Sequence, residues 1–252
     1  MSRTRKTTVS TLGATLGAVA LVGSLTGVAS ASARSDNGVA DKSAQEIAAA
    51  SKSAFEGATS VHVKTASKDM PEGLPSAMDL KLDRDGNCSG SVARSGRGGY
   101  EIIKQGDKVW IRPDAAWVKD NVPAEDQKAL SDALKGGKYL YGTTADDTLK
   151  EASQVCDLSA VQERLNAHQP ASGLKKAGKA EVNGAGAVEI TGIKGGLQAQ
   201  VWVATDGKPY PLRGVAEGTT GEGKKLNVTT TYSDYDKPLD VKTPSAGQST
   251  KL

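Results

Sequence analysis

Short runs in which apolar and polar residues alternate are the feature that most constrains the fold of this 252-residue chain. Such runs occur at 61–64, 78–83, 197–203 and 226–232. A period of two is that of a β-strand with one buried face. Turn pairs such as Asn183-Gly184 separate several of the runs, as they do in hairpins. The chain is therefore expected to form a large antiparallel sheet that is covered on one face only.

Helical patterns occur in two other places. Ser43 and Glu46 have the spacing of a capping box, and apolar residues up to Phe55 follow at helical spacing. Three further helical stretches are expected between 123 and 167, whereas 115–119 is expected to be a short strand. The order is helix, strands, helices, strands, which indicates an α+β fold with the helices on one side of the sheet.

The first 33 residues have the pattern of a secretory signal peptide. Three basic residues precede an uncharged stretch that ends in small residues at 29–33. The alternative is a membrane anchor, but the apolar core at 18–28 is shorter than the roughly 20 residues that a spanning helix needs. We expect cleavage after Ala31 or Ala33 and a secreted protein, extracellular or associated with the cell wall.

The remaining chain divides into three predicted parts. Residues 34–42 are expected to be a flexible lead-in, 43–242 one folded domain, and 243–252 a disordered tail. The chain has 32 Lys and Arg against 29 Asp and Glu, and three of the basic residues lie in the signal peptide. A neutral mature protein has no broad field to attract nucleic acid. We therefore expect no nucleic-acid partner and, without a second long apolar run, no stable membrane anchor.

Cys88 and Cys156 are the only cysteines. An even number of cysteines in an exported protein favours a disulfide. The alternative is a reactive thiol, but neither cysteine has a neighbouring His or a Cys-x-x-Cys partner that would lower its pKa. The structural bridge is the prediction.

Signatures of catalysis are weak. His62 alternates with valines and is expected on the solvent face of a strand, and His168 follows a predicted helix end. The acidic pairs Asp146-Asp147 and Asp234/Asp236 are interpreted as helix-start and turn residues. No nucleophile elbow, zinc-binding helix or phosphate-binding loop occurs in the sequence. We predict no enzyme activity, no catalytic residue, no metal site and no cofactor, with a hydrolase as the least favoured function.

Trp110 and Trp202 fall on the less apolar face of their predicted strands. They either pack beneath another element or line a groove, and the sequence does not separate these alternatives.

Several phrases in the sequence follow the order of a known family. They are Ser43–Phe55 before Val61–Val63, Tyr100–Ile103, Lys108–Ile111, Trp117–Lys119, Glu181–Gly184, Val201–Val203 with Asp206-Gly207, and Thr231–Asp234. Over residues 45–242 the chain thereby resembles the LppX/LprG-type actinobacterial envelope lipoproteins of the LolA-like lipoprotein-carrier superfamily. The resemblance implies a curved antiparallel half-barrel with helices over its concave face and a lipid held between sheet and helices.

A cavity of this kind would be lined by apolar strand residues. The candidates are Val61, Val63, Met78, Leu80, Leu82, Val201, Val203, Leu226 and Val228. For each of them the alternative is ordinary core. Many members of the family carry a cysteine directly after the signal peptide for lipid attachment, whereas the first cysteine here is Cys88. The protein is therefore expected to be released rather than lipid-anchored.

The sequence thus favours a secreted, non-enzymatic binding protein that carries a lipid or acylated molecule. The alternative is an extracellular accessory or interaction protein of the same fold without a small ligand. The sequence identifies no protein partner.

Overall fold

A computed structural model describes residues 36–67, 69–73, 75–167, 169–219 and 223–251. The predicted signal peptide with its cleavage sites, and His168, lie outside these residues.

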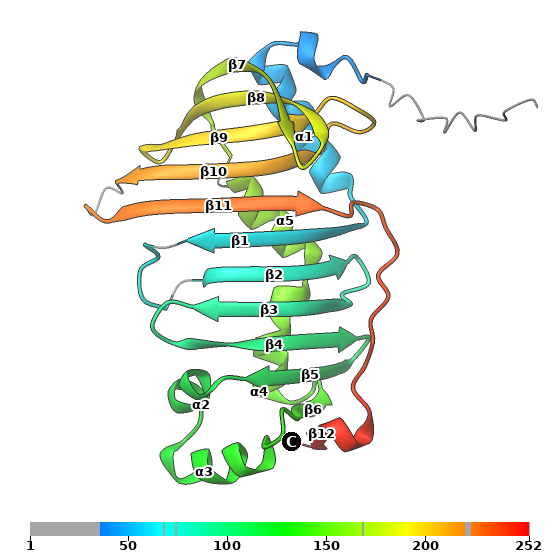
Figure 1. Ribbon diagram of the computed structural model, residues 1–252, viewed down its shortest axis with the longest axis vertical. Helices are drawn as coiled ribbons and strands as arrows, with labels where there is room; N and C mark the ends of the chain where they lie inside the picture. The colour runs from blue at the N-terminus through cyan, green and yellow to red at the C-terminus, as the bar shows by residue number, and fades with distance from the viewer. Residues whose placement is uncertain (1–35, 68, 74, 168, 220–222, 252) are drawn as a thin grey trace, which may run out of the picture. The chain divides into compact units, whose positions relative to one another are not determined.

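Twelve strands form one open sheet in the order β12-β6-β5-β4-β3-β2-β1-β11-β10-β9-β8-β7 (Figure 1). The strands are β1 Ser60–Ser67, β2 Pro75–Asp83, β3 Cys88–Arg94, β4 Gly98–Gln105, β5 Lys108–Pro113, β6 Tyr139–Thr143, β7 Ser172–Val182, β8 Ala185–Lys194, β9 Leu197–Ala204, β10 Pro211–Thr219, β11 Lys225–Ser233 and β12 Ser249–Lys251. Neighbouring strands are antiparallel, except that β12 runs parallel to β6. The predicted α+β fold, a curved antiparallel half-barrel, is confirmed.

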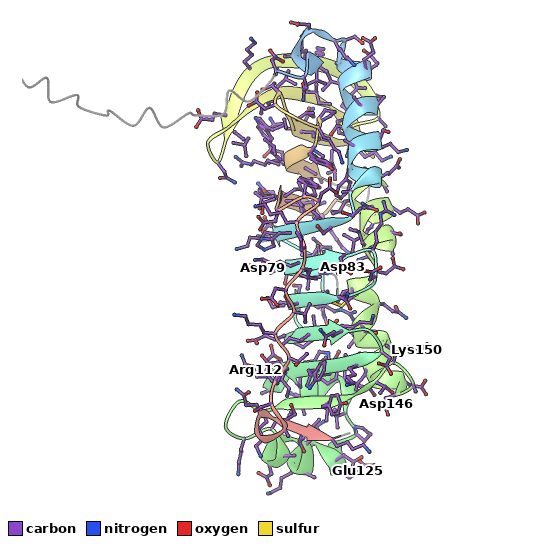
Figure 2. All side chains as sticks on the ribbon, turned by 90° about the vertical axis from the view of Figure 1, so that its right-hand side faces the viewer. Asp79, Asp83, Arg112, Glu125, Asp146 and Lys150 are labelled. Carbon is purple, nitrogen blue, oxygen red and sulfur yellow. A yellow bond between two sulfur atoms is a disulfide. The ribbon has the colours of Figure 1, made fainter. Side chains whose placement is uncertain are left out.

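Helices line one face of this sheet. The helical elements in the described part of the chain are η1 Val39–Asp41, α1 Ala44–Gly57, α2 Ala115–Asn121, α3 Ala124–Ala133, α4 Asp147–Ser153, η2 Gln154–Cys156, α5 Leu158–Ala167 and η3 Ala246–Gln248. Seen from the edge, α1, α4 and α5 lie on one side of the sheet, and the labelled Asp79 and Arg112 lie on the other (Figure 2). We call these sides the helix-covered face and the open face.

The first helix forms where the sequence predicts it. The Ser43 side chain accepts a hydrogen bond from the Glu46 N–H, and the Glu46 carboxylate accepts one from the Ser43 N–H at 2.9 Å. This capping box satisfies amide groups at the helix start that have no partner within the helix. Ile47 and Phe55 then point inward and are fully buried, which fixes α1 against the sheet.

The core consists of two separate apolar clusters on the helix-covered face. The large cluster lies mainly over β1–β6 and includes Phe55, Leu80 and Ile102 among its buried members. The small cluster combines η1 and α1 with β8 and β9. Its members are Val39, Ala44, Ile47, Val188, Ile190, Val201 and Val203. The sheet is therefore held to its helices at two places rather than by one continuous core.

A disulfide between Cys88 on β3 and Cys156 in η2 closes the large cluster. Both residues are at most 1% exposed. The bridge attaches the α4–α5 segment covalently to the middle of the sheet, and the predicted pairing is confirmed.

Residues 115–119, expected as a strand, form helix α2 instead. The Asp114 carboxylate accepts a hydrogen bond from the Trp117 N–H at 2.8 Å, so it caps a helix start. The strand β6 that follows was not predicted. Its short Tyr-Leu-Tyr-Gly-Thr sequence lies between helical stretches and contains only five residues.

Both predicted flexible ends make specific contacts in the described residues. In the lead-in 34–42, the Asn37 side chain donates hydrogen bonds to Ala204 O and Gly207 O, and Val39 is 2% exposed. In the tail 243–252, η3 precedes β12, which pairs with the free edge of β6. Backbone pairing at a sheet edge needs no apolar side chains, so this small, polar segment carries no hydrophobic signal of a strand.

Among the described residues, no helix has the length and apolar character to span a bilayer.

Candidate functional site

The nine candidate lining residues separate into two groups in the structure. Six are at most 5% exposed: Val61, Val63, Leu80 and Leu82 in the large cluster, and Val201 and Val203 in the small one. The other three are half-buried: Met78, Leu226 and Val228. Strand β1 lies between β11 and β2. Val228 of β11 pairs with Ser67 of β1, and Met78 of β2 pairs with Thr65 of β1. The side chains of Val228 and Met78 therefore lie toward the same end of the sheet, on the helix-covered face.

Strand β10 lies between the two clusters and contributes to neither. Gly214 pairs with Val201 on one side and Thr230 on the other, and Ala216 pairs with Ala199 and Val228. Side chains opposite one another in a sheet share a face. On the helix-covered face β10 begins with Pro211, opposite Val203, and from Gly214 onward presents only the small residues Gly214, Ala216 and Gly218. We call this strip, with Leu226 and Val228 of β11, the seam.

Gly214 lies at the centre of the seam. A Cβ atom there would meet only Gln200 O and the Tyr232 hydroxyl, each at 4.0 Å, which is ordinary van der Waals contact. The backbone at Gly214 therefore has room for a small side chain, and no buried side chain of either cluster comes from β10.

The Tyr232 hydroxyl lies beside Gly214 without a hydrogen-bond partner among the described residues. Tyr232 is 8% exposed, and its ring packs edge-on against Phe55 with 5.4 Å between the ring centroids. Burial raises the pKa of Tyr232 well above its usual value. Tyr232 therefore supplies a free donor and acceptor inside an apolar strip.

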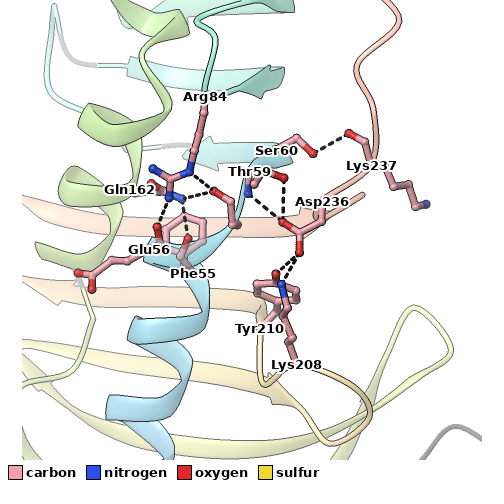
Figure 3. A network of polar contacts seen from close by, with 11 residues as sticks. Phe55, Glu56, Thr59, Ser60, Arg84, Gln162, Lys208, Tyr210, Asp236 and Lys237 are labelled. Atoms are coloured by element: carbon pink, nitrogen blue, oxygen red, sulfur yellow. Dashed lines mark hydrogen bonds and ion pairs between the residues drawn. The ribbon is translucent and has the colours of Figure 1, made fainter.

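One carboxylate, that of Asp236, joins the two sides of the seam (Figure 3). It accepts hydrogen bonds from the Thr59 N–H after α1 and, beside β10, from Lys208 Nζ and the Tyr210 hydroxyl, at 2.8, 2.8 and 2.5 Å. Burial alone would raise the pKa of Asp236, but these hydrogen bonds outweigh it and hold the pKa far below the usual value. The carboxylate therefore stays ionised and fixes this end of the seam.

The end of α1 is held on the same side. Gln162 of α5 is 4% exposed and donates to Phe55 O at 2.5 Å, and Arg84 donates to Glu56 O and Ala58 O (Figure 3). These bonds help to satisfy the carbonyl groups at the end of α1, where Phe55 O also accepts from the Ala58 N–H. The polar network thus closes one end of the helix-covered face, while the described residues at the end with Met78 and Val228 form no such network.

The open face carries cross-strand ion pairs. His62 Nε2 lies 2.6 Å from Asp79, which also pairs with Lys64 at 2.9 Å, and Arg112 pairs with Glu101 at 2.5 Å. Burial alone would raise the pKa of Asp79, but hydrogen bonds from His62 and Lys64 outweigh it and lower the pKa. Beside these pairs lies an open hollow of about 610 Å³ with Ala66, Ala77 and Ala93 in its lining. On this face the charges of Asp79, Glu101 and Arg112 are therefore already paired.

Of the remaining sequence candidates, His62 lies on the open face, whereas Asp146 and Asp147 begin α4. The position of His62 is as expected, and its side chain is 16% exposed. The Ser233 hydroxyl lies 3.5 Å from His62 Nδ1, at the limit of a hydrogen bond, so Ser233, His62 and Asp79 form no close relay. No group of three His, Cys, Asp or Glu in the described residues could hold a metal ion.

The two tryptophans pack against neighbours rather than in the seam. Trp110 is 6% exposed and stacks on Tyr141 with 4.9 Å between ring centroids. Trp202 lies beneath the Arg213 guanidinium, 5.0 Å from the ring centre. The packing alternative for both residues is therefore the one that the structure favours.

The seam was missed at the sequence level because its residues are small. Gly214, Ala216 and Gly218 alternate with period two, as strand residues do, but they carry no strong hydrophobic signal. A strand with small residues on its covered face, beside strands rich in Val and Leu, is the pattern that could have revealed it.

Comparison with known proteins supports the fold. No family model matches the chain, and no curated protein matches its sequence. The crystal structure of LprF from Mycobacterium bovis is 15% identical over 81% of this chain and 97% of LprF, with a TM-score of 0.54. That of the lipoprotein LppX from Mycobacterium tuberculosis is 17% identical over 79% of this chain and 99% of LppX, with a TM-score of 0.48. The expected LppX/LprG-type fold is thereby confirmed.

Proposed function

We propose that this protein is a secreted, non-enzymatic binding protein that holds an acyl chain in the seam between sheet and helices. It acts outside the cytoplasmic membrane, in the extracellular space or in the cell wall, after its signal peptide is cleaved past Ala31 or Ala33. The ligand is a lipid or an acylated molecule, and no catalysis is required of the protein.

The observation that carries this proposal is the strip of small residues at Gly214 and Ala216 next to the Tyr232 hydroxyl, which has no hydrogen-bond partner among the described residues. A Cβ at Gly214 would meet only Gln200 O and the Tyr232 hydroxyl within 4.0 Å, so no other side chain from either cluster covers this position. An acyl chain between the two clusters would lie over this strip, and an ester or carboxyl oxygen could accept from Tyr232.

The energetics suit a chain of ordinary length. Each buried methylene contributes about 0.8 kcal/mol, so about ten of them contribute about 8 kcal/mol. This is comparable with the estimated 4–15 kcal/mol that association costs in lost freedom. The half-buried Met78, Leu226 and Val228 extend the apolar surface from the seam towards solvent and offer an entry. In this proposal the six buried candidate residues form the walls on either side of the acyl chain and do not contact it directly.

The fold supports the same proposal. The chain shares its architecture with LprF, whose fold is the curved half-barrel that the sequence resemblance associates with a lipid between sheet and helices.

Solvent extraction and mass spectrometry of natively purified protein test the proposal. The wild type is expected to release an acyl-bearing molecule in near-stoichiometric amount. Gly214→Leu places a side chain in the seam and should abolish this cargo while leaving the fold intact. Gln200→Leu adds the same side chain on the open face, where Gln200 pairs with Val215, and should retain the cargo.

The alternative is a ligand-free accessory or interaction protein of the same fold. Six of the nine candidate residues are packed within the clusters, which favours it. An empty extract from the wild type, together with failure of added acyl ligands to bind, would establish this alternative.

A further inference from the structure

Arg94, at the end of β3, is a cation at the entry to the seam. Cys88, Val92 and Arg94 alternate onto the helix-covered face, since Val92 pairs with Met78 and belongs to the large cluster. Arg94 is half-buried. Burial raises the pKa of Tyr100, and the positive charge of Arg94 nearby partly opposes that rise. Arg94 therefore lies beside the apolar entry and not on the open face.

The Arg94 side chain has no ion pair or hydrogen bond within the part of the chain that the structure describes, whereas the side chains of nearby arginines do. Arg97 lies 3.9 Å from Glu72 and 3.5 Å from Asp120, and Arg112 is paired with Glu101. Glu151 of α4 helps to raise the pKa of Tyr100 through its negative charge. Its carboxylate does not come within ion-pair distance of Arg94. A half-buried guanidinium loses hydration, and without an acidic partner that loss is not offset.

A second polar group lies near it on the same face. The Ser67 hydroxyl at the end of β1 is buried and has no hydrogen-bond partner in the described chain. Ser67 pairs with Val228, and β1 and β3 flank β2. Two strand spacings separate Ser67 from Arg94, which is roughly 10 Å. Apolar Met78 lies on β2 between these two strands.

We propose that Arg94 and Ser67 bind the anionic head group of an amphiphile whose acyl chain occupies the seam. The inference rests on the proposed function and specifies its ligand as an acyl chain with a carboxylate or phosphate head. A guanidinium offers two parallel donors that match either of these anions. The unpartnered Ser67 hydroxyl supplies a further donor at the same entry.

Paired ligands that differ only in charge test this assignment. The probes are 5-doxylstearic acid and its methyl ester at pH 8, where the acid is ionised. Binding is read from quenching of tryptophan fluorescence. Trp117 is a suitable reporter because its ring lies 6.1 Å from that of Tyr100. A hydrogen bond to a charged group contributes about 1.5–3 kcal/mol, so the acid should bind at least about tenfold more tightly than the ester.

The variants are Arg94→Gln, Arg94→Lys and the control Arg97→Gln. Arg94→Gln should weaken binding of the acid by about tenfold and leave the ester unchanged, whereas Arg94→Lys should keep part of the preference. Arg97→Gln should change neither. Near-UV circular dichroism confirms that each variant is folded.

Competition experiments then distinguish an anion carried on an acyl chain from a free anion. Palmitoyl lysophosphatidic acid should displace the probe, and monopalmitoyl glycerol should do so more weakly. Inorganic phosphate alone should not displace it, because it has no chain for the seam.

The outcomes are distinguishable. Equal binding of acid and ester to the wild type, or equal effects of Arg94→Gln and Arg97→Gln, overturns the head-group assignment and leaves the acyl site standing. Failure of both probes to bind the wild type contradicts the proposed function itself.

Discussion

The two core clusters lie on the same face of one sheet but are built differently. The large cluster has Phe55, Tyr100 and Trp117 in it and a disulfide through its centre. The small cluster consists only of Val, Ile and Ala residues, with no disulfide and no aromatic ring among its buried members. The first is filled by large side chains and fixed covalently, whereas the second depends on the contact of η1 and α1 with two strands.

This difference explains why a seam exists between them. Large side chains from the first cluster end at Tyr232, and β10 provides only small residues to bridge the gap to Val201. Because packing energy depends on close contact, the two clusters are only weakly joined through apolar atoms at this point. The polar network at Asp236 does much of the joining instead.

Removing the disulfide should have the largest effect on stability. Cys88 and Cys156 are 68 residues apart, and closure of a loop of this size is worth about 4 kcal/mol in the chain-entropy model. The double variant Cys88→Ala/Cys156→Ala should lose about this amount in urea unfolding. A loss below about 1 kcal/mol would show that the covalent link does not distinguish the large cluster.

Asp236→Asn should have the next largest effect, because it weakens the polar link across the seam. Loss of charge-assisted hydrogen bonds to Lys208 and Tyr210 should cost about 2 kcal/mol at pH 7. Asp132→Asn, which removes an exposed carboxylate on α3 that pairs with Lys128, is the control and should leave unfolding nearly unchanged. Equal effects of the two variants in urea unfolding would contradict a special role for Asp236.

The same carboxylate predicts an acid dependence. The folded pKa of Asp236 lies far below the unfolded value of about 3.9, so the unfolded state binds more protons between the two. Its contribution to stability is complete above the unfolded pKa and is lost as pH falls through the folded one. The unfolding free energy of the wild type should therefore fall below about pH 5 more steeply than that of Asp236→Asn.

A matched pair of valines compares the packing of the clusters directly. Val63 and Val203 are both fully buried, one in each cluster. Truncation to Ala should cost about 1.6 kcal/mol in transfer free energy at either site, plus a cavity term that depends on how far the neighbours relax. Val203 lies nearer the seam, so Val203→Ala should cost about 0.5–1 kcal/mol less than Val63→Ala. The reverse order in urea unfolding would contradict the difference in packing.

Much of this architecture could be predicted from local sequence signals. The capping box at Ser43, the alternating strands and the pairing of the two cysteines each depend on a pattern with one dominant structural meaning, and the structure confirms all three. Helix α2 was mistaken for a strand because Trp and Val favour strands, while its actual determinant is the Asp114 cap. Tertiary context thus overrode propensity over seven residues.

The candidate site was predicted less well. Alternation identifies which residues face the helices, but it does not tell whether a covered side chain packs in a cluster or borders a space. Val61 and Val228 have the same pattern in the sequence, yet only Val228 is half-buried. That outcome depends on β10, whose Gly214 and Ala216 are distant in sequence from β1 and β2. The strip of small residues at Gly214 and the lone charge of Arg94 become visible only once the strands are assembled.

Photo-crosslinking tests the central claim, an acyl chain in the seam, most directly. A fatty acid with a diazirine in mid-chain is bound to the folded protein and irradiated, and the adducts are mapped by mass spectrometry. The account predicts adducts on β10 and β11, at Ala216, Val228 or Tyr232, and their loss in Gly214→Leu. Adducts confined to the open face, or an unchanged pattern in Gly214→Leu, would contradict it.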